Sequence, residues 1–118
     1  TESKAVSRAM AYVISNYHWF VAEGAINAAR QVTNDDPDLQ SRPDCLGASR
    51  VLVTEERGKF RKVLINNGGM MDKATKGVVF HGAFLKPGAD FKTQRLACDV
   101  FSKALKKHGV VTDVFTNG

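Results

Sequence analysis

The 118-residue chain is predicted to be a single α+β domain, in which one antiparallel sheet of three to four strands packs against an N-terminal helical segment and a C-terminal helix. Three observations predict this class. Apolar residues recur at helical spacing near both ends, and β-branched runs separated by turn residues occupy the middle. The length also suits one hydrophobic core without metal or disulfide support. The expected order of elements is helix, three strands, helix, strand.

The N-terminal segment, residues 1–32, is predicted to be helical. Apolar residues recur there at spacings of four, three, four and three, which places on one face Val6, Met10, Val13, Tyr17 and Phe20. We expect this face to lie against the sheet or another helix. A glycine inside a helix costs about 1 kcal/mol relative to alanine, so Gly24 predicts a division into two helices, with a break between residues 16 and 24.

The middle of the chain is predicted to form the sheet. Residues 33–50 are dense in Asp, Asn, Pro, Ser and Gly, which favour turns, and they predict a loop of a length that often carries function. Two β-branched runs, Val51–Thr54 and Phe60–Ile65, predict a hairpin around residues 55–58. Residues 66–69, Asn-Asn-Gly-Gly, turn the chain again before a third strand, Gly77–Leu85.

The clearest helix is predicted over Phe91–Lys107. Asp90 is suited to cap its N-terminus, and Gly109 stands where a helix-ending glycine is common. The apolar side of this helix includes Leu96, Ala97, Cys98, Val100, Phe101, Ala104 and Leu105. A short strand, Val110–Phe115, is expected to return to the sheet.

Positive charge is concentrated in the second half of the chain. Residues 1–59 hold seven basic and eight acidic side chains, a net charge of −1, whereas residues 60–118 hold ten and four, a net charge of +6. Such asymmetry predicts a surface that binds a polyanion, nucleic acid and RNA in particular. A well-solvated surface is the alternative explanation, and an acidic protein is the alternative partner.

Nucleic-acid contacts are predicted for Arg61, Lys62, Lys86, Lys92, Arg95, Lys103, Lys106 and Lys107. Five charged residues of the last helix share one face: Lys92, Arg95, Asp99, Lys103 and Lys106. Lys86 and the helix N-terminus at residues 90–93 would also favour phosphate. The same helix face fits a solvated surface held by i,i+4 ion pairs, Arg95 with Asp99 and Asp99 with Lys103.

The order helix, three antiparallel strands, helix, with a basic second helix after a glycine-containing turn, is similar to that of a double-stranded-RNA-binding domain. The matching segment is Gly88–Leu105, in which Lys92 and Arg95 stand near the helix start. The similarity implies recognition of RNA by shape, through phosphate contacts. The chain departs from that pattern at Thr93 and Gln94, in the length of its first helix and in its final strand, so the similarity is architectural.

His81 and His108 are the candidate catalytic residues of an alternative function, a metal-independent ribonuclease of the kind found among small bacterial toxins. Such an enzyme needs an acid, a base and a cation near the phosphate. His81 supplies the acid or base in this hypothesis, with His108, Arg61, Lys62 or Lys86 as its partners. Ordinary structural roles also fit these histidines, because a strand residue can bond a neighbouring carbonyl and a cation suits a helix C-terminus.

Several other chemistries are excluded by the motifs. The chain lacks the His-x-Glu and Pro-Cys-x-x-Cys pattern of zinc deaminases, a phosphate-binding loop and a nucleophile elbow, so no cofactor or metal is predicted. Cys45 and Cys98 are too far apart in sequence for a local metal or redox motif, although an exported protein could join them in one long-range disulfide. Cys98 falls on the apolar side of a predicted helix, where a free thiol packs as a small hydrophobic group, and this favours a reducing, cytoplasmic location. No apolar run is long enough to span a membrane, and we expect a soluble domain of undetermined oligomeric state.

Overall fold

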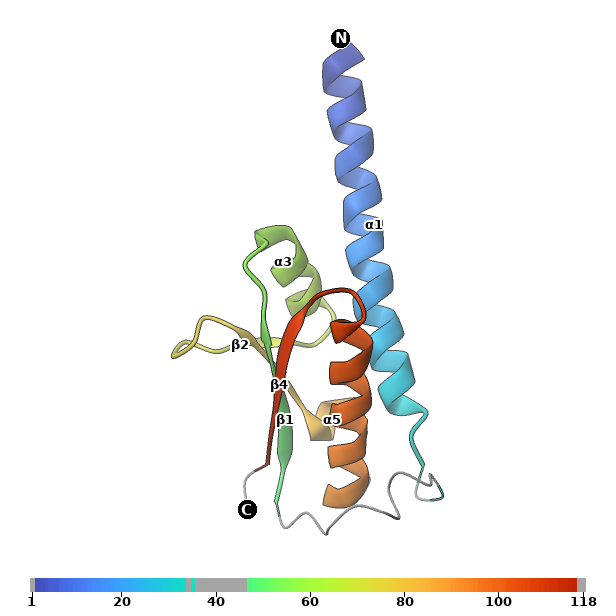
Figure 1. Cartoon of the computed structure of the whole chain (residues 1–118), viewed down its shortest axis with the longest axis vertical. Coiled ribbons are helices and arrows are strands. Elements are labelled where there is room, and N and C mark those ends of the chain that lie inside the picture. Colours follow the sequence, from blue (N-terminus) through green and yellow to red (C-terminus); the bar gives the residue numbers. More distant parts are fainter. Residues whose placement is uncertain (1, 34, 36–46, 117–118) are drawn as a thin grey trace.

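The computed structural model describes residues 2–33, 35 and 47–116, with side chains from residue 16 onward, and it shows an α+β fold (Figure 1). The elements in chain order are α1 (Glu2–Arg30), β1 (Ser49–Thr54), α3 (Gly58–Asn66), β2 (Met70–Met71), β3 (Val78–His81), α4 (Gly82–Leu85), α5 (Phe91–Lys106) and β4 (Val111–Thr116). The predicted class, an antiparallel sheet packed against an N-terminal helix and a C-terminal helix, is confirmed.

The four described strands form one sheet in the order β2-β3-β1-β4, and every neighbouring pair is antiparallel. From β1 onward the chain therefore follows a β-α-β-β-α-β path with β1 and β3 at the centre, the split β-α-β arrangement. This path differs from that of the double-stranded-RNA-binding domain that the element order resembles, because α3 separates β1 from β2 and β4 pairs with β1.

The hairpin predicted around residues 55–58 is wrong, because residues 58–66 form helix α3. Phe60 and Leu64 are buried four residues apart, and Val63 packs beside them, so the segment buries a stripe at helical spacing. A two-residue strand, β2, which the sequence did not predict, takes the place beside β3 instead.

Only the first half of the third predicted strand, Gly77–Leu85, forms a strand. β3 ends at His81, and residues 82–85 form the single turn α4, which the prediction of a strand over Gly77–Leu85 missed. This turn directs Leu85 and Phe84 into the core from the helical side of the sheet. A continuing strand would instead have pointed neighbouring side chains to opposite faces.

Helix α1 runs through Gly24 without the predicted break, because Gly24 lies on the exposed side and burial of the opposite side holds the helix together. In its described part, Tyr17 and Phe20, the predicted packing face is also wrong. Tyr17 and Phe20 are 49% and 71% exposed, and Val6, Met10 and Val13 lie outside the described side chains. The buried face consists of His18, Val21, Ala22, Ala25, Ile26 and Ala29. Its alanines allow α5 to approach α1 closely.

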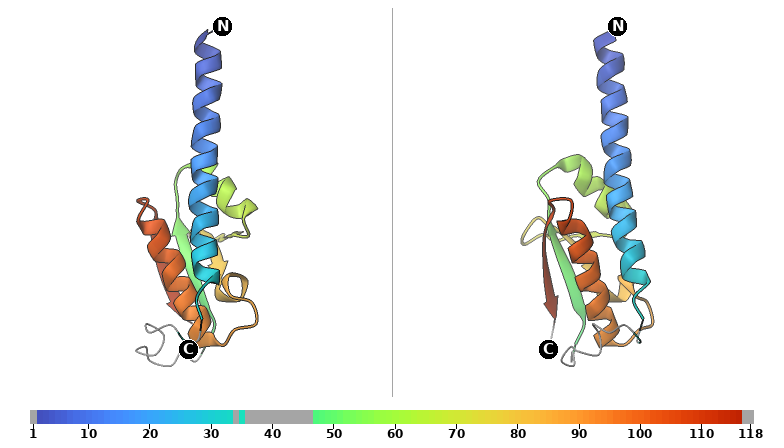
Figure 2. Two further views of the ribbon diagram at one scale, coloured as in Figure 1. Left: turned by 90° about the vertical axis from the view of Figure 1, so that its right-hand side faces the viewer. Right: turned by 45° about the vertical axis from the view of Figure 1, so that its right-hand side comes forward.

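The core lies between the sheet and the helices, which pack on one face of the sheet (Figure 2). Three phenylalanines from different elements form its centre: Phe60 of α3, Phe80 of β3 and Phe101 of α5. The ring centroids of Phe80 and Phe101 are 4.7 Å apart. Cys98 is buried beside them, and burial raises the pKa of its thiol to about 12. Cys45 lies outside the described residues.

Two glycines beside the β2–β3 hairpin lie too close to their neighbours for any side chain. A Cβ atom on Gly69 would stand 2.3 Å from Cγ1 of Val78 and 2.9 Å from the carbonyl oxygen of Leu64. One on Gly77 would stand 2.7 Å from Cδ1 of Leu52. The hairpin can therefore pack against α3 and β1 only because both positions lack a side chain.

The boundaries predicted for the last helix are confirmed almost to the residue. The Asp90 carboxylate accepts the backbone N–H of Thr93 at 2.8 Å, which is the expected cap. Gly109 has a φ of 78°, a left-handed conformation that glycine adopts without steric cost, and it leads the chain into β4.

His18 is buried on α1, at 4% exposure, with its ring edge-on to Phe60 at a centroid distance of 4.5 Å. Its Nδ1 atom has no hydrogen-bond partner among the described residues. Burial, followed by the positive charge of Arg57, holds the pKa of His18 below its ordinary value. The fold therefore favours the neutral ring.

We expect the free energy of unfolding to fall as the pH drops below about 6.5, where the unfolded chain protonates His18 and the folded chain resists. His18 changes the free energy of unfolding by at most about 1.4 kcal/mol per pH unit. This pH dependence disappears at lower pH, once the ring is also protonated in the folded protein. Urea unfolding at pH 7.5 and pH 5.5, compared between the wild type and His18→Phe, measures it. An equal pH dependence in both proteins would contradict the assignment.

Candidate nucleic-acid interface

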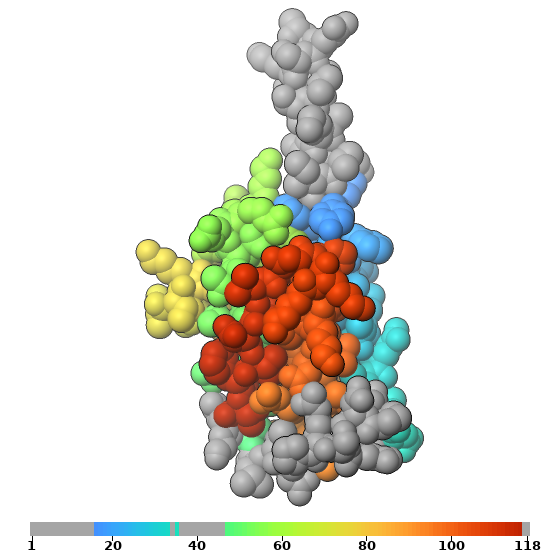
Figure 3. All heavy atoms as spheres, viewed as in Figure 1, coloured from blue at the N-terminus to red at the C-terminus, as the bar shows by residue number. Residues whose placement is uncertain are grey.

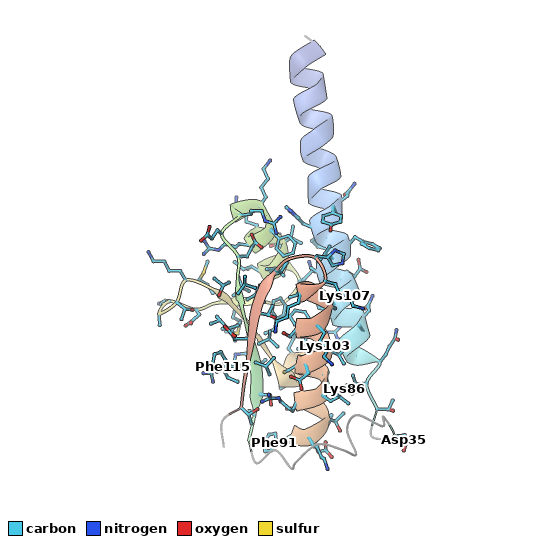
Figure 4. The ribbon with its side chains drawn as sticks, in the orientation of Figure 1. Asp35, Lys86, Phe91, Lys103, Lys107 and Phe115 are labelled. Atoms are coloured by element: carbon cyan, nitrogen blue, oxygen red, sulfur yellow. The ribbon has the colours of Figure 1, made fainter. Side chains whose placement is uncertain are left out.

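Three lysines at the C-terminal end of α5 are the exposed part of the predicted basic surface. Lys103, Lys106 and Lys107 are exposed, and none has an acidic partner in the part of the chain that the structure describes. Figure 4 shows Lys103 and Lys107 along the outer side of α5. Cations at this position are stabilised by the negative end of the helix dipole, so their presence costs the fold little.

The other half of the same helix face is occupied by internal contacts. The Arg95 guanidinium donates to the hydroxyl of Thr116 on β4, and its Nε atom lies 3.5 Å from a carboxylate oxygen of Asp99. The predicted i,i+4 pair between Arg95 and Asp99 is thus formed. Lys92 is half-buried and also has a partner. The bond from Arg95 to Thr116 joins α5 to β4, and the lysines of the C-terminal end are the accessible charges.

The N-terminus of α5 lies in a hollow of about 400 Å³ together with Lys86. The Lys86 ammonium donates to the carbonyl oxygen of Arg30 at 2.5 Å. Hydrogen bonds from the side chain and backbone of Thr93 hold the pKa of Asp90 below its usual value, so this carboxylate is ionised at the helix start. A phosphate would meet that negative charge, which makes this end a poorer anion site than the sequence suggests.

Arg61 and Lys62 lie on α3, which packs against α1 and β3, apart from the lysines of α5. The Arg61 guanidinium donates to the sulfur of Met71 at 3.2 Å, and Arg61 is half-buried. Lys62 is exposed. The structure therefore divides the predicted basic residues among α3, the start of α5 and the end of α5.

The face of the sheet turned away from the helices is not covered by any described element (Figure 2). Its residues alternate with the buried ones along each strand. His81, Arg50 and Phe115 stand opposite one another across β3, β1 and β4. The Arg50 guanidinium lies 5.4 Å from the centre of the Phe115 ring, and Phe115 is 42% exposed.

Phe115 and Arg50 were not among the predicted site residues. The signal for Phe115 was the alternation in residues 111–116, which places Val111, Asp113 and Phe115 on one side and the buried Thr112 on the other. The sequence gives no indication that this side lacks a covering helix, because that depends on which face α1 and α5 choose.

The two candidate catalytic histidines are not brought together. His81 stands opposite Arg50 near the start of β1, whereas His108 borders a hollow of about 430 Å³ with Thr54 at the end of that strand. Arg50 and Thr54 are four residues apart on β1, a distance of about 13 Å along the strand. Nδ1 of His108 is also hydrogen-bonded to the Tyr17 hydroxyl at 2.8 Å. A ribonuclease mechanism that pairs these two residues is thus not supported.

The described residues contain no group of three or more His, Cys, Asp or Glu side chains arranged to hold a metal ion. None of the helices in the described part of the chain has both the length and the apolar character needed to cross a membrane.

Fold and site together define a split β-α-β domain that has one uncovered sheet face and a lysine-bearing helix next to its edge strand. Comparisons of the chain with protein-family models, with curated proteins and with solved structures gave no match.

Proposed function

We propose that this protein binds single-stranded RNA across the side of the molecule formed by β4 and α5. The observation that carries the proposal is that Phe115 is exposed on β4, Lys103 and Lys107 are exposed at the C-terminal end of α5, and β4 and α5 lie side by side (Figure 3 and Figure 4). A strand that stacks a base on Phe115 can pass over the edge of β4 and place its phosphates near the lysines.

The lysines supply the affinity that does not depend on sequence. A lysine brought close to a phosphate releases condensed counterions, so binding weakens linearly with the logarithm of salt concentration. Lys103, Lys106 and Lys107 have no acidic partner in the described part of the chain, so contact with phosphate breaks no ion pair seen there.

Phe115 supplies a stacking surface. Aromatic side chains on the open face of a four-stranded sheet stack two or three bases in one common class of RNA-binding module, and this fold presents an aromatic side chain in a comparable position. The comparison is an analogy between architectures and says nothing of descent. The Arg50 guanidinium lies over this ring, and its positive charge attracts both the face of the ring and a nearby phosphate.

The proposal is tested by fluorescence anisotropy with a labelled single-stranded RNA of about ten nucleotides. We expect binding that weakens with salt at a slope of at least about 2 in the logarithmic plot, since three phosphates are neutralised. Duplex RNA should bind more weakly, because its bases cannot reach Phe115. Absence of binding at 50 mM salt, or binding that salt does not affect, would contradict the proposal. If an acidic protein displaces the labelled RNA and unlabelled RNA does not, the result would favour an acidic protein as the partner.

Replacement of Phe115 by alanine is expected to weaken single-stranded RNA binding about 5- to 100-fold, the usual effect of losing one stacked base. Phe91→Ala is the matched control, because Phe91 is similarly exposed, at 46% against 42%, but lies at the start of α5. Titration of both variants with the same RNA distinguishes stacking from general loss of apolar surface. Equal weakening in the two variants would place the stacking site elsewhere.

A further inference from the structure

Asp113 is the one acidic residue in the four described strands. It is exposed in the middle of β4, on the uncovered face of the sheet. β4 is the edge strand beside α5, so Asp113 lies within the side of the molecule that we propose for RNA. A carboxylate there repels phosphate, and neither the lysines nor the stacking surface accounts for it.

The residues that flank Asp113 on this face are apolar. Val111 and Phe115 lie two residues away on either side along β4, and Leu52 stands directly opposite on β1. Arg50, which stands opposite Phe115, lies over the ring of that residue. In the part of the chain that the structure describes, the Asp113 side chain makes no hydrogen bond or ion pair. A carboxylate accepts hydrogen bonds through two oxygen atoms, and both are available to N–H groups of a ligand.

Asp113 and Phe115 are placed to act on the same base. They lie on one face of β4, about 7 Å apart along the strand. A purine is larger than a phenyl ring, so a base stacked on Phe115 can extend its edge to the Asp113 carboxylate. In single-stranded RNA the Watson–Crick edge of such a base has no pairing partner and can be read by hydrogen bonds.

Guanine is the base whose edge suits a carboxylate. Its N1–H and N2–H groups are adjacent donors, and they match two acceptor oxygens in the way that a guanidinium does. Adenine and cytosine each present one amino group next to an acceptor nitrogen, and uracil presents one N–H between two carbonyl oxygens. Each of these three bases therefore turns an acceptor toward the second carboxylate oxygen, which repels it.

We infer that this protein selects guanine in single-stranded RNA, with the base stacked on Phe115 and its N1–H and N2–H groups donating to the Asp113 carboxylate. The inference rests on the proposed function and adds base specificity to it. The lysines of α5 supply affinity for any sequence, whereas Asp113 distinguishes one base from the others. It does so in two ways, because the same carboxylate attracts the donors of guanine and repels the acceptors of its competitors.

The experiment compares a labelled uridine decamer with decamers that carry one different central nucleotide, by fluorescence anisotropy at 0.1 M salt. One guanosine should tighten binding at least about tenfold, the usual effect of hydrogen bonds to a charged group. One adenosine, a purine that also stacks, should tighten it less than about threefold. Inosine keeps N1–H but lacks the 2-amino group of guanosine, so it should recover only part of the gain.

Asp113→Asn tests the residue itself. Asparagine has nearly the same shape but places a donor beside its acceptor, so the preference for guanosine should fall to within about twofold. The uridine decamer should bind this variant at least as tightly as the wild type, because a repelling charge is gone. Glu23→Gln is the matched control, since it removes one negative charge from an exposed residue of α1, and it should keep the preference.

Failure of the inference and failure of the proposed function give different results. A wild type that binds none of the decamers at 50 mM salt would overturn both. Equal binding of all decamers, or a preference for guanosine that persists in Asp113→Asn, would overturn the inference alone. If Asp113→Asn instead removes a preference for RNA over DNA of the same sequence and leaves the preference among bases unchanged, the carboxylate binds the ribose 2′-hydroxyl, and the inference is likewise overturned.

Discussion

Replacement of Phe80 by alanine is expected to lower the free energy of unfolding by about 3–5 kcal/mol, a large part of the stability of a small domain. Phe80 is fully buried on β3, and its ring lies 4.7 Å from Phe101 and 6.3 Å from Phe84. These rings come from β3, α4 and α5, so the cavity would open where three elements meet. The sheet and the helices packed on its one covered face cannot close such a space without disturbing one another.

Urea unfolding followed by circular dichroism measures this effect. Phe115→Ala is the matched control, because the same residue type lies on the same sheet but on its uncovered face. We expect the control to lose less than about 1 kcal/mol, since an exposed ring creates no cavity. Similar losses in the two variants would show that the core is not centred on Phe80.

Replacement of Lys103, Lys106 and Lys107 together by glutamine is expected to weaken RNA binding about 100-fold at 0.1 M salt. Each phosphate contact contributes about 0.7 to the salt slope for single strands, so the loss of three contacts lowers the slope by about 2. The three side chains are exposed and make no described internal contact, so the free energy of unfolding should fall only by their interaction with the helix dipole, about 0.3–1 kcal/mol for each lysine. Anisotropy titrations from 50 to 400 mM salt give both the affinity and the slope.

A second triple variant, Lys59, Lys73 and Lys76 to glutamine, makes the same change in net charge away from α5. These exposed residues lie on α3 and in the β2–β3 hairpin. The proposed interface predicts a clearly smaller loss of affinity for this variant than for the α5 variant. Equal losses would mean that RNA responds only to the overall charge of the domain, and the α5 lysines would then have no special part.

Local signals explain why α5 could be predicted and α3 could not. The boundaries of α5 are set by Asp90 at one end and Gly109 at the other, and each acts through its own nearest backbone groups. The run Phe60–Ile65 has no such cap, since Arg57 offers no capping side chain to the helix start. A six-residue run in which four residues are apolar fits either a strand or a helix, and here contacts with α1 and the sheet decide between them.

The sequence predicts which residues carry the positive charge, but not which of these side chains are engaged in contacts within the fold. Arg95 donates a hydrogen bond to Thr116, 21 residues away in sequence, and Lys86 donates one to Arg30, 56 residues away. Only the folded chain shows that these two cations are engaged while Lys103, Lys106 and Lys107 are not. The uncovered sheet face was unpredictable for the same reason, because only the folded chain shows on which face of the sheet the helices pack.

The close contacts at Gly69 and Gly77 restrict which sequences can share this fold. Any larger residue would strike Val78 from one position and Leu52 from the other, on either side of the same hairpin. Divergent relatives can change the lysines of α5 or the aromatic residues of α1 without altering the core, but they must keep these two glycines eight positions apart. This pair, followed by the buried Val78 and Phe80, is therefore a more durable mark of ancestry than any residue of the proposed binding surface.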